Sequence, residues 1–378
     1  MLNVKFDKNY IWILLFSIWL TIPNILILTS NLNLILQEIV FLFIIFLYIF
    51  KFGFRILKIS KINFIIFLVF LFIILFSMIF NIDRYNVLIN FINFIIFYYC
   101  IAIFSEKHPE LFLKSLKLYS LINLIILFLV VYLNYGSSLR GLIDGVQPNY
   151  IGLICLTVAL SSIIFQNKIY TSLILLSSLY ISYLVSSRTT MVCIVLITLF
   201  FIYNQLRKKI VNLFFSINLL IILLILNYDQ LLSVISDYLM LDDSYRGLDS
   251  GFSGRSDRWA VAFNYIENNL FFGVGFKEGE KTLGYTTDNG YVSVLLELGI
   301  VGFIFYLTLF LSALWISFKF RNKNSYMKFN MITIFIFLIY CFFEQRYINF
   351  GNALSYIVFF SLFSVLNLNR SVKWQKYQ

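Results

Sequence analysis

Two arginines stand close together in the most polar stretch of the chain. Arg255 and Arg258 lie in the segment SGRSDRWAVAFNYIENNLFFGVGF, where apolar residues recur at helical spacing. If Ser253 or Ser256 caps this helix, both arginines fall near its first turn, where backbone N–H groups also attract an anion. A guanidinium is a planar, permanently charged fork that matches the oxygens of phosphate. The segment therefore predicts a diphosphate-binding site, and the alternative is a solvated ion pair of the arginines with Asp257 and neighbouring acids.

Two further ionisable residues stand where an ordinary span would carry none. Arg188 falls in a very short turn between two apolar runs, on the side opposite to most of the basic residues. We expect a functional role for it, with anchoring of the end of a span as the alternative. Glu297 falls about two turns inside an apolar run, where an isolated carboxylate is costly. We therefore expect Glu297 to face a polar cavity and to bond to the backbone or to an arginine.

The composition shows which elements must position these residues. Hydrophobic residues make up 61% of the chain and charged residues 12%, and the mean hydropathy is +0.89, far outside the range of soluble domains. A bilayer solvates this much apolar surface, and a spanning helix needs about 20 apolar residues. The sequence therefore predicts an all-α polytopic integral membrane protein, in which residues 1–378 form a single transmembrane domain.

Apolar runs of the required length predict about twelve transmembrane helices. They cover residues 10–29, 32–50, 62–81, 86–104, 116–134, 149–165, 169–185, 189–205, 210–227, 290–318, 328–343 and 348–367. If both termini are cytoplasmic, most of the 29 basic residues fall on the cytoplasmic side, as the positive-inside rule requires. Residues 228–289, between the ninth and tenth spans, then form one large extracytoplasmic loop with short amphipathic helices that lie at the membrane interface.

Charge and cysteine usage argue against several kinds of site. The formal net charge of +11 follows the expected topology, so we do not predict nucleic-acid binding. The four cysteines all fall inside expected spans and show no metal or redox spacing. His108 is the only histidine, and it falls on a cytoplasmic loop. We therefore expect neither a metal nor a cofactor at the outer face.

Five short motifs, in order, are similar to those of a known family. The resemblance is carried by the segments GVQPNY (145–150), SSRTT (186–190), GRSDRW (254–259), NNLFFGVGF (268–276) and DNGYVSVLLELGIVG (288–302). Together they resemble the bacterial O-antigen polymerase (Wzy-type) and O-antigen ligase superfamily of polytopic membrane glycosyltransferases. In that family the segments read NPN, SRT, GRxxxW, PxxGxG, and HNxY followed by ExGxxG. This sequence departs from the pattern at Asp288, where ligases usually have histidine.

The resemblance implies a GT-C-like fold and an enzyme that transfers glycans carried by undecaprenyl diphosphate. It implies action at the outer face of the bacterial cytoplasmic (inner) membrane, as a step in lipopolysaccharide biosynthesis. By motif position, Arg188 and Arg255 would hold the diphosphate, whereas Arg258 has no firm counterpart. The implied partners are the undecaprenyl-diphosphate-linked oligosaccharide, the lipid bilayer and a chain-length regulator protein.

The chemistry of the residues agrees with glycosyl transfer. A sugar linked through its anomeric carbon to a diphosphate already carries a good leaving group, so the enzyme mainly needs cationic stabilisation of the departing charge. Arg188, Arg255 and Arg258 can provide it. The attacking hydroxyl benefits from a base, and Asp288 is the candidate, with capping of the next helix as its alternative role. We expect a metal-independent transfer and, from the resemblance, inversion at the anomeric carbon.

Other residues near the outer face are candidates for contact with the glycan. The candidates for substrate binding are Arg258, Gln147, Asn149, Trp259, Asn289, Tyr291 and Glu297. Gly299 and Gly302 suit close packing of helices better than contact with a ligand. Glu344 and Arg346 flank a very short outer turn, where we expect a structural ion pair.

Three functions fit these expectations. The first is an O-antigen or surface-polysaccharide polymerase, which joins lipid-linked repeat units. The second is an O-antigen ligase, which transfers the finished glycan to the lipid A core, and Asp288 in place of histidine argues against it. The third is a polyprenyl-linked glycan flippase or transporter, which should show broken helices and two related halves. Because the sequence shows no internal repeat, we predict the polymerase.

Overall fold

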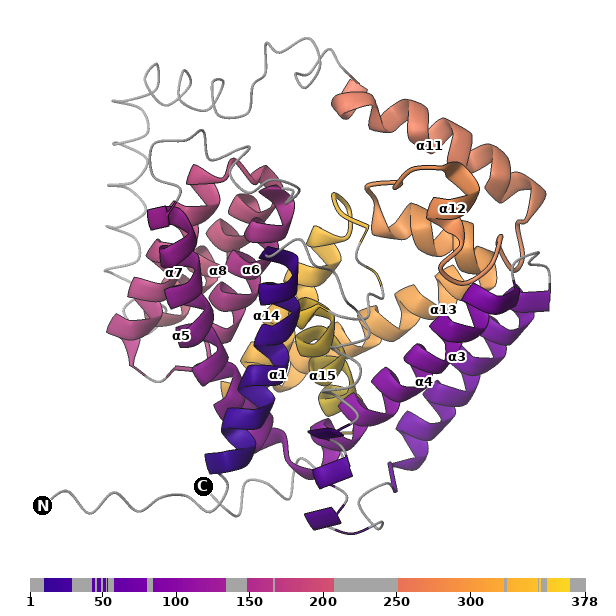
Figure 1. Ribbon diagram of the computed structural model, residues 1–378. Helices are drawn as coiled ribbons and strands as arrows, with labels where there is room; N and C mark the ends of the chain where they lie inside the picture. The colour runs from indigo at the N-terminus through magenta and orange to yellow at the C-terminus, as the bar shows by residue number, and fades with distance from the viewer. Residues whose placement is uncertain are drawn as a thin grey trace, which may run out of the picture.

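The part of the chain that the computed structural model describes is helical, with no strand among its residues. It comprises residues 10–28, 43–44, 46–48, 50–51, 53, 58–79, 84–133, 148–165, 167–206, 251–322, 325–345, 347 and 352–367. The helices (Figure 1) are α1 (Tyr10–Leu28), α3 (Lys61–Ile79), α4 (Arg84–Lys107), α5 (Pro109–Leu133), α6 (Pro148–Ser162), α7 (Lys168–Leu184), α8 (Arg188–Leu206), α11 (Gly251–Asn268), α12 (Gly279–Leu283), α13 (Gly290–Phe320), α14 (Ser325–Tyr340) and α15 (Ala353–Leu366).

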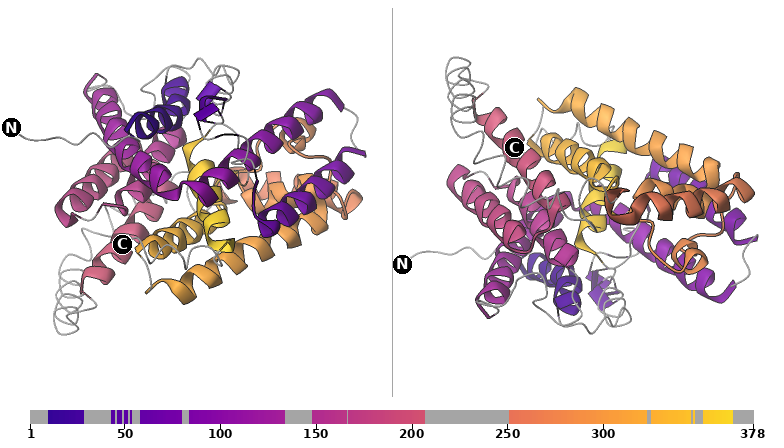
Figure 2. Two further views of the ribbon diagram at one scale, coloured as in Figure 1. Left: turned by 90° about the horizontal axis from the view of Figure 1, so that it is seen from below. Right: turned by 90° about the horizontal axis from the view of Figure 1, so that it is seen from above.

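The described helices form two groups on either side of a central pair. α1, α5, α6, α7 and α8 pack on one another in sequence on one side, and α3, α4 and α13 lie together on the other. α14 and α15 lie between the groups: α14 contacts α8 and α13, and α15 contacts α4, α6 and α13. Figure 2 shows this division from below and from above, with the yellow α15 at the centre.

Helix α15 is the core of the bundle. Every residue from Ala353 to Val365 is at most 5% exposed. The aromatic side chains make the closest contacts, with Phe360 stacked on Phe112 of α5 at a centroid distance of 4.0 Å and Phe363 at 4.5 Å from Tyr98 of α4. A helix that is apolar all round is buried on all sides. α15 therefore fixes the relative positions of the helices that reach the site.

Hydrogen bonds between side chains hold α1, α5 and α6 together inside the bundle. Asn24 Nδ2 donates to Tyr119 Oη at 2.9 Å and to Asn123 Oδ1 at 2.7 Å, and Tyr119 Oη lies 2.6 Å from Thr157 Oγ1. Such polar contacts connect helices where lipid supplies no hydrophobic drive for their association.

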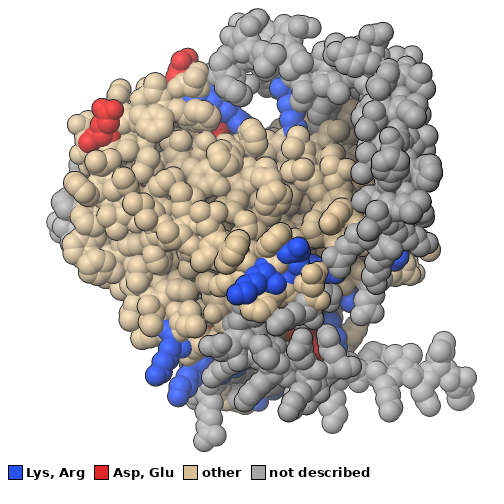
Figure 3. Space-filling view, turned by 180° about the vertical axis from the view of Figure 1, so that it is seen from behind, with Lys and Arg blue, Asp and Glu red and all other residues tan. Residues whose placement is uncertain are grey.

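Three described helices are long and apolar enough to cross a membrane, namely Pro109–Leu133, Arg188–Gln205 and Gly290–Phe320. Shorter apolar helices of 10–17 residues surround them. Large apolar side chains point outward, among them Ile125, Leu173 and Leu176. On the face shown in Figure 3, acidic and basic side chains lie at the upper end, and a broad uncharged band separates them from further basic side chains of the lower half. These features indicate a membrane protein, whereas the number of spans and the side that each loop faces stay predictions.

Among the described residues, helices lie where the apolar runs predict spans, and one of them differs in detail. The expected span 210–227 lies outside the described residues, as do residues 228–250 of the expected outer loop, and of 32–50 only residues 43–44, 46–48 and 50 are described. The expected continuous span 290–318 is wrong in one respect. α13 is interrupted at Gly299, whose φ of 65° and ψ of −171° are not helical.

Candidate active site

Helix α11 places Arg255 and Arg258 at the end of the bundle, beside the start of α13 (Figure 1). Ala262 and Ile266 are four residues apart, so they share one face of α11, and both are buried against α13. Trp259 packs beside this cluster. The amphipathic helix expected here is present, and its apolar face is covered by α13.

The expected serine cap of this helix is wrong. α11 begins at Gly251, so Ser253 and Ser256 both lie inside it. Arg255 and Arg258 therefore stand in its second and third turns, where the field of the helix N-terminus has largely faded. The positive charge at this position comes from the two guanidinium groups.

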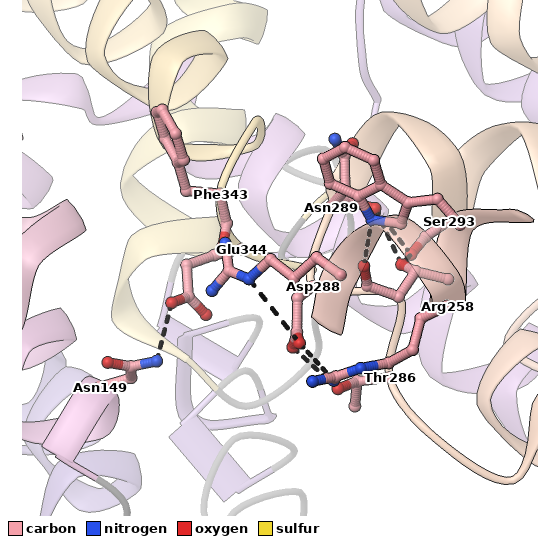
Figure 4. A network of polar contacts seen from close by, with 11 residues as sticks. Asn149, Arg258, Thr286, Asp288, Asn289, Ser293, Phe343 and Glu344 are labelled. Carbon is pink, nitrogen blue, oxygen red and sulfur yellow. Dashed lines mark hydrogen bonds and ion pairs between the residues drawn. The ribbon is translucent and has the colours of Figure 1, made fainter. Parts of the chain in front are cut away.

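Asp288 brings the two guanidinium groups together (Figure 4). Arg258 Nη1 donates to Asp288 Oδ2 at 2.6 Å, and Arg255 Nε lies 4.0 Å from the same oxygen. Thr286 Oγ1 donates to the other oxygen, Oδ1, at 2.9 Å. The side chains of Arg255, Arg258 and Asp288 are 23%, 35% and 26% exposed, so a ligand from solution can reach them. The ion pair of the arginines forms with Asp288, not with Asp257 as in the alternative.

The backbone around Asp288 is held in an unusual conformation. Asp288 has a φ of 50°, in the left-handed region that aspartate tolerates better than most residues. The next residue, Asn289, caps α13, because its Oδ1 accepts from the N–H groups of Tyr291 at 2.9 Å and Val292 at 3.1 Å. Helix capping therefore belongs to Asn289, and the side chain of Asp288 is turned to the arginines instead.

The segment before Asp288 is tied to α11 and α13. Trp259 Nε1 donates to the carbonyl oxygen of Thr287 at 2.8 Å. Thr287 Oγ1 lies 2.6 Å from Ser293 Oγ and donates to the carbonyl oxygen of Asn289 at 2.9 Å. Trp259 thus positions the loop that carries Asp288.

The loop that follows α14 closes the site from another side. Arg255 Nη1 donates to the carbonyl oxygen of Phe343 at 3.0 Å. The adjacent residue, Glu344, is 7% exposed, and its Oε1 accepts from Asn149 Nδ2 of α6 at 2.9 Å. Gly290 N–H donates to the carbonyl oxygen of Cys341 at 2.7 Å. One short loop therefore connects α11, α13 and α6.

Tyr291, a substrate-binding candidate, also contacts α14. Its hydroxyl group donates to the carbonyl oxygen of Leu338 at 2.7 Å, and its ring lies 4.7 Å from that of Phe342. These contacts give Tyr291 a packing role between α13 and α14.

Arg188 begins α8, directly after a tight turn against α6. Ser186 has a φ of 56°, and Ser187 Oγ donates to Thr190 Oγ1 at 2.9 Å. A Cβ atom on Gly152 of α6 would lie 2.3 Å from Ser187 Oγ, so α6 and this turn are in close contact. Asn149 stands one turn before Gly152 on α6. The structure therefore places Arg188 next to the helix whose Asn149 bonds to Glu344.

The interruption of α13 is filled by the loop between α11 and α12. Val274 and Gly275 donate their N–H groups to the carbonyl oxygens of Leu296 (2.8 Å) and Glu297 (3.2 Å). In return, the N–H group of Ile300 donates to the carbonyl oxygen of Leu270 at 2.8 Å. These bonds replace the helical bonds that are lost at the break.

Glycines allow this close approach of two backbones. A Cβ atom on Gly299 would lie 2.3 Å from the carbonyl carbon of Phe271, and one on Gly273 would lie 2.4 Å from that of Glu297. On Gly302 it would lie 2.3 Å from Leu298 Cβ. Gly299 is thus a close-packing position as expected, although its neighbour is a loop and not a helix. The close atom at Gly302 belongs to α13 itself, and Ile73 Cγ2 of α3 would lie 3.4 Å away.

Glu297 of α13 is buried beside the loop between α11 and α12. It is 1% exposed, and its Oε2 accepts from the N–H group of Lys277 at 2.7 Å and from the hydroxyl group of Tyr347. Lys277 Nζ lies 4.4 Å from the centre of the Tyr347 ring. The expected bond to backbone is confirmed, and Glu297 links the loop between α11 and α12 to Tyr347, before α15.

The site joins residues that sequence reasoning singled out with some that it missed. Arg255, Arg258, Trp259 and Asp288 come together as neighbours, while Gln147 lies outside the described residues. The carbonyl group of Phe343 and the hydroxyl group of Thr286 have no sequence signal. Glu344 had one, its place in a short outer turn, although Arg346, its expected partner, is outside the described residues.

The arrangement has the groups to bind a dianion. Two guanidinium groups that share one carboxylate offer several N–H donors to phosphate oxygens once a ligand competes for them. A second carboxylate, Glu344, follows the carbonyl group that Arg255 contacts. Cationic binding groups beside a carboxylate are the elements required for transfer of a group from a phosphate ester.

Comparison with known protein families gives a partial match. A family profile described as O-antigen ligase matches residues 173–307, which are 135 of the 378 residues. The matched range includes Arg188, Arg255, Arg258 and Asp288, and it leaves out α6 and the loop after α14. The comparison with curated proteins found no match. The chain is thus similar, over about a third of its length, to the O-antigen ligase superfamily, and the match does not separate a polymerase from a ligase.

Proposed function

We propose that the protein is a surface-polysaccharide polymerase of the O-antigen type. It joins oligosaccharide repeat units carried by undecaprenyl diphosphate, at the outer face of the bacterial cytoplasmic membrane. The observation that carries the proposal is the convergence of Arg255 and Arg258 on Asp288, within the range matched by the O-antigen ligase profile. The enzyme is a glycosyltransferase that needs no metal, since the guanidinium groups supply the positive charge.

The leaving group determines what the arginines do. Cleavage of the bond between the anomeric carbon and the diphosphate oxygen leaves negative charge on the diphosphate. Arg255 and Arg258 stabilise this charge, and Arg188, at the start of α8, completes the clamp. Direct displacement by an acceptor hydroxyl group inverts the anomeric carbon.

The acceptor hydroxyl group must lose a proton during the transfer. Asp288 is the base that the sequence suggests, and in the structure its two oxygens accept from Arg258 and Thr286. Diphosphate binding to the arginines draws them away from Asp288, because phosphate oxygens compete for the same donors. Asp288 therefore couples binding of the donor to the arrangement of the site.

The ligase is a second candidate, because the matched profile carries that description. The two enzymes share the donor and differ in the acceptor, which is a lipid-linked repeat unit for the polymerase and a lipid A core for the ligase. A flippase is less well supported. Its broken helices should expose backbone groups to a substrate, whereas the break at Gly299 is closed by Val274 and Gly275.

Purified protein in detergent tests the proposal. We would incubate it with a synthetic polyprenyl-diphosphate oligosaccharide and a chelator, with and without a lipid A core acceptor, and measure product length by gel electrophoresis and mass spectrometry. A ladder formed without lipid A core supports the polymerase. A single product that appears only with lipid A core supports the ligase, and intact substrate in both would contradict glycosyl transfer.

Variants of the arginines test the clamp in the same assay. Arg255→Ala and Arg188→Ala should abolish the ladder while the protein still inserts into the membrane. Arg255→Lys should restore little activity, because a lysine keeps the charge and loses the bidentate fork. Full activity of both alanine variants would refute the proposal that these arginines bind the diphosphate.

A further inference from the structure

We propose that Leu270 and Phe271, in the loop between α11 and α12, insert into the acyl chains of the lipid leaflet that borders the Asp288 end of the bundle. The partner of this surface is ordinary phospholipid. The inference does not depend on the proposed function, because it concerns how the end of α11 is held and not what the arginines bind.

The loop carries two large apolar side chains at its surface. Leu270 is 43% exposed and Phe271 is 65% exposed. The apolar face of α11 does not serve the membrane contact expected from the sequence, because Ala262 and Ile266 on that face are buried against α13. Contact with lipid therefore falls to side chains outside that face.

The loop continues a surface of exposed apolar side chains on α3 and α13 (Figure 1). The ring centroid of Phe272 lies 5.2 Å from that of Phe76, which lies 4.4 Å from that of the exposed Phe72 of α3. On the other side, the N–H group of Val301 donates to the carbonyl oxygen of Phe271 at 3.4 Å, and the Val301 side chain is also exposed. Two apolar helices thus extend their outward faces into the loop.

The helices α3 and α13 run antiparallel beside this loop. The ring centroid of Phe305 lies 4.9 Å from that of Phe70, and a Cβ atom on Gly302 would lie 3.4 Å from Ile73 Cγ2. Higher residue numbers in α13 therefore meet lower numbers in α3. Each helix has a lysine at the end away from the loop, α3 at its start and α13 in its last turn. The two basic ends lie on the same side of the bundle.

Helix lengths place the loop near the opposite boundary of the hydrocarbon layer. At 1.5 Å per residue, Phe76 lies about 23 Å along α3 from Lys61, and Ile300 lies about 28 Å along α13 from Lys319. The hydrocarbon layer of a bilayer is about 30 Å thick, and lysines remain at its edge. Phe272 contacts Phe76, and Ile300 donates to the loop, so both helices put the loop at the same depth.

The backbone of the loop is suited to contact with lipid. Lipid supplies no hydrogen bonds, so polar backbone groups that enter it must be bonded within the protein. The side-chain amides of Asn268 and Asn269 donate to backbone carbonyl oxygens one turn earlier in α11, at 2.9 and 3.0 Å. The carbonyl groups of Leu270 and Phe271 accept from N–H groups of α13, at 2.8 and 3.4 Å. The end of α11 and the turn after it can therefore approach the acyl chains.

Insertion of the loop also limits where the arginines of α11 can lie. Arg258 lies about 15 Å along α11 from Asn268, at 1.5 Å per residue. An anchor at the end of the helix therefore keeps Arg258 close to the lipid headgroups, whatever the tilt of α11.

Nitroxide labels measure the depth of these positions. The four native cysteines are buried, so a thiol-specific nitroxide labels a cysteine introduced at the surface, and wild-type protein treated in the same way is the blank. Phe271→Cys and Leu270→Cys would be labelled in detergent and reconstituted in liposomes of phosphatidylethanolamine and phosphatidylglycerol without polyprenyl lipid. Phe72→Cys, at an exposed position of α3, is the reference for lipid, and Glu280→Cys, at an exposed acid of α12, is the reference for water.

Power saturation then compares the accessibility of each label to oxygen with its accessibility to a water-soluble nickel complex. We expect the ratio for Phe271→Cys to be at least about threefold above that of Glu280→Cys, because a polar complex is excluded from hydrocarbon whereas oxygen enters it. The ratio should approach that of Phe72→Cys. Leu270→Cys should give the same result, and it keeps the test decisive if Phe271→Cys does not fold.

Three results would overturn the inference. A ratio equal to that of Glu280→Cys would place the loop in water. A Phe271→Cys label that enters lipid only after decaprenyl diphosphate is added would assign the surface to the isoprenoid tail of a ligand. A label shielded from both reagents, with spin–spin broadening that disappears on dilution with unlabelled protein, would assign it to a second copy of this chain. Failure of the ladder assay would leave the anchor intact, since the depth measurement involves no glycosyl transfer.

Discussion

The backbone contact at Gly299 predicts a large loss of stability for a very small change. In Gly299→Ala the new methyl group would lie 2.3 Å from the carbonyl carbon and oxygen of Phe271. The φ of 65° and ψ of −171° belong to a region that only glycine adopts readily, which costs about 1–3 kcal/mol for alanine. Moving the loop away also weakens hydrogen bonds such as Val274 to Leu296, each worth about 1 kcal/mol. We expect Gly299→Ala to lower the free energy of unfolding by about 3–5 kcal/mol in total.

Gly284 offers a matched control for this variant. It also has a positive φ, 78°, but a Cβ atom there would meet nothing within 4 Å. Gly284→Ala should therefore cost only the backbone term of about 1–2 kcal/mol. Thermal unfolding of both purified variants in the same detergent, followed by tryptophan fluorescence, compares them directly. The melting temperature of Gly299→Ala should fall at least about twice as far, and an equal fall in the two variants would refute the close approach of the backbones.

Three further predictions concern the site and its supports. Asp288→Asn removes the carboxylate that competes for the arginines, so binding of inorganic pyrophosphate should tighten about fivefold to tenfold in isothermal titration; weaker binding would mean that Asp288 only orders the arginines. Tyr347→Phe removes the hydroxyl donor to buried Glu297 and should cost about 1–3 kcal/mol in thermal unfolding, whereas an unchanged melting temperature would contradict the bond. Trp259→Phe keeps an aromatic ring but loses the hydrogen bond to the carbonyl group of Thr287, so proteolysis of the loop that carries Thr287 should become faster at nearly constant melting temperature, and unchanged proteolysis would contradict a role of this bond in holding the loop.

Much of the helix arrangement could be predicted from the sequence because the signal is local. An apolar run such as residues 168–184 forms a helix wherever lipid or other helices surround it, so its position follows from composition alone. A cationic site at Arg255 and Arg258 was also predictable, because the two arginines are close together in the sequence. Its partner was not, because Asp257 is a neighbour in sequence while Asp288 reaches the arginines only through the fold.

Other features depend on contacts between distant segments. Residues 290–320 read as one continuous span, since the break at Gly299 forms only when the loop of residues 270–275 supplies hydrogen-bond partners. The start of α11 at Gly251 could not be read from Ser253 or Ser256, because capping residues are also common inside helices. Glu344 stood apart from every motif, and only the folded chain shows that Asn149 of α6 faces it.

The paired backbones at Gly299 set a limit on how this protein can be recombined with a relative. The loop of residues 270–275 and the first half of α13 each satisfy the backbone groups of the other, so neither is complete alone. A graft that exchanges only this loop separates the two partners and leaves their backbone N–H and C=O groups without hydrogen-bond partners. The two segments can therefore be exchanged only as one block, from the start of α11 to a point beyond Gly302, which makes residues 251–302 the smallest exchangeable unit at this end of the bundle.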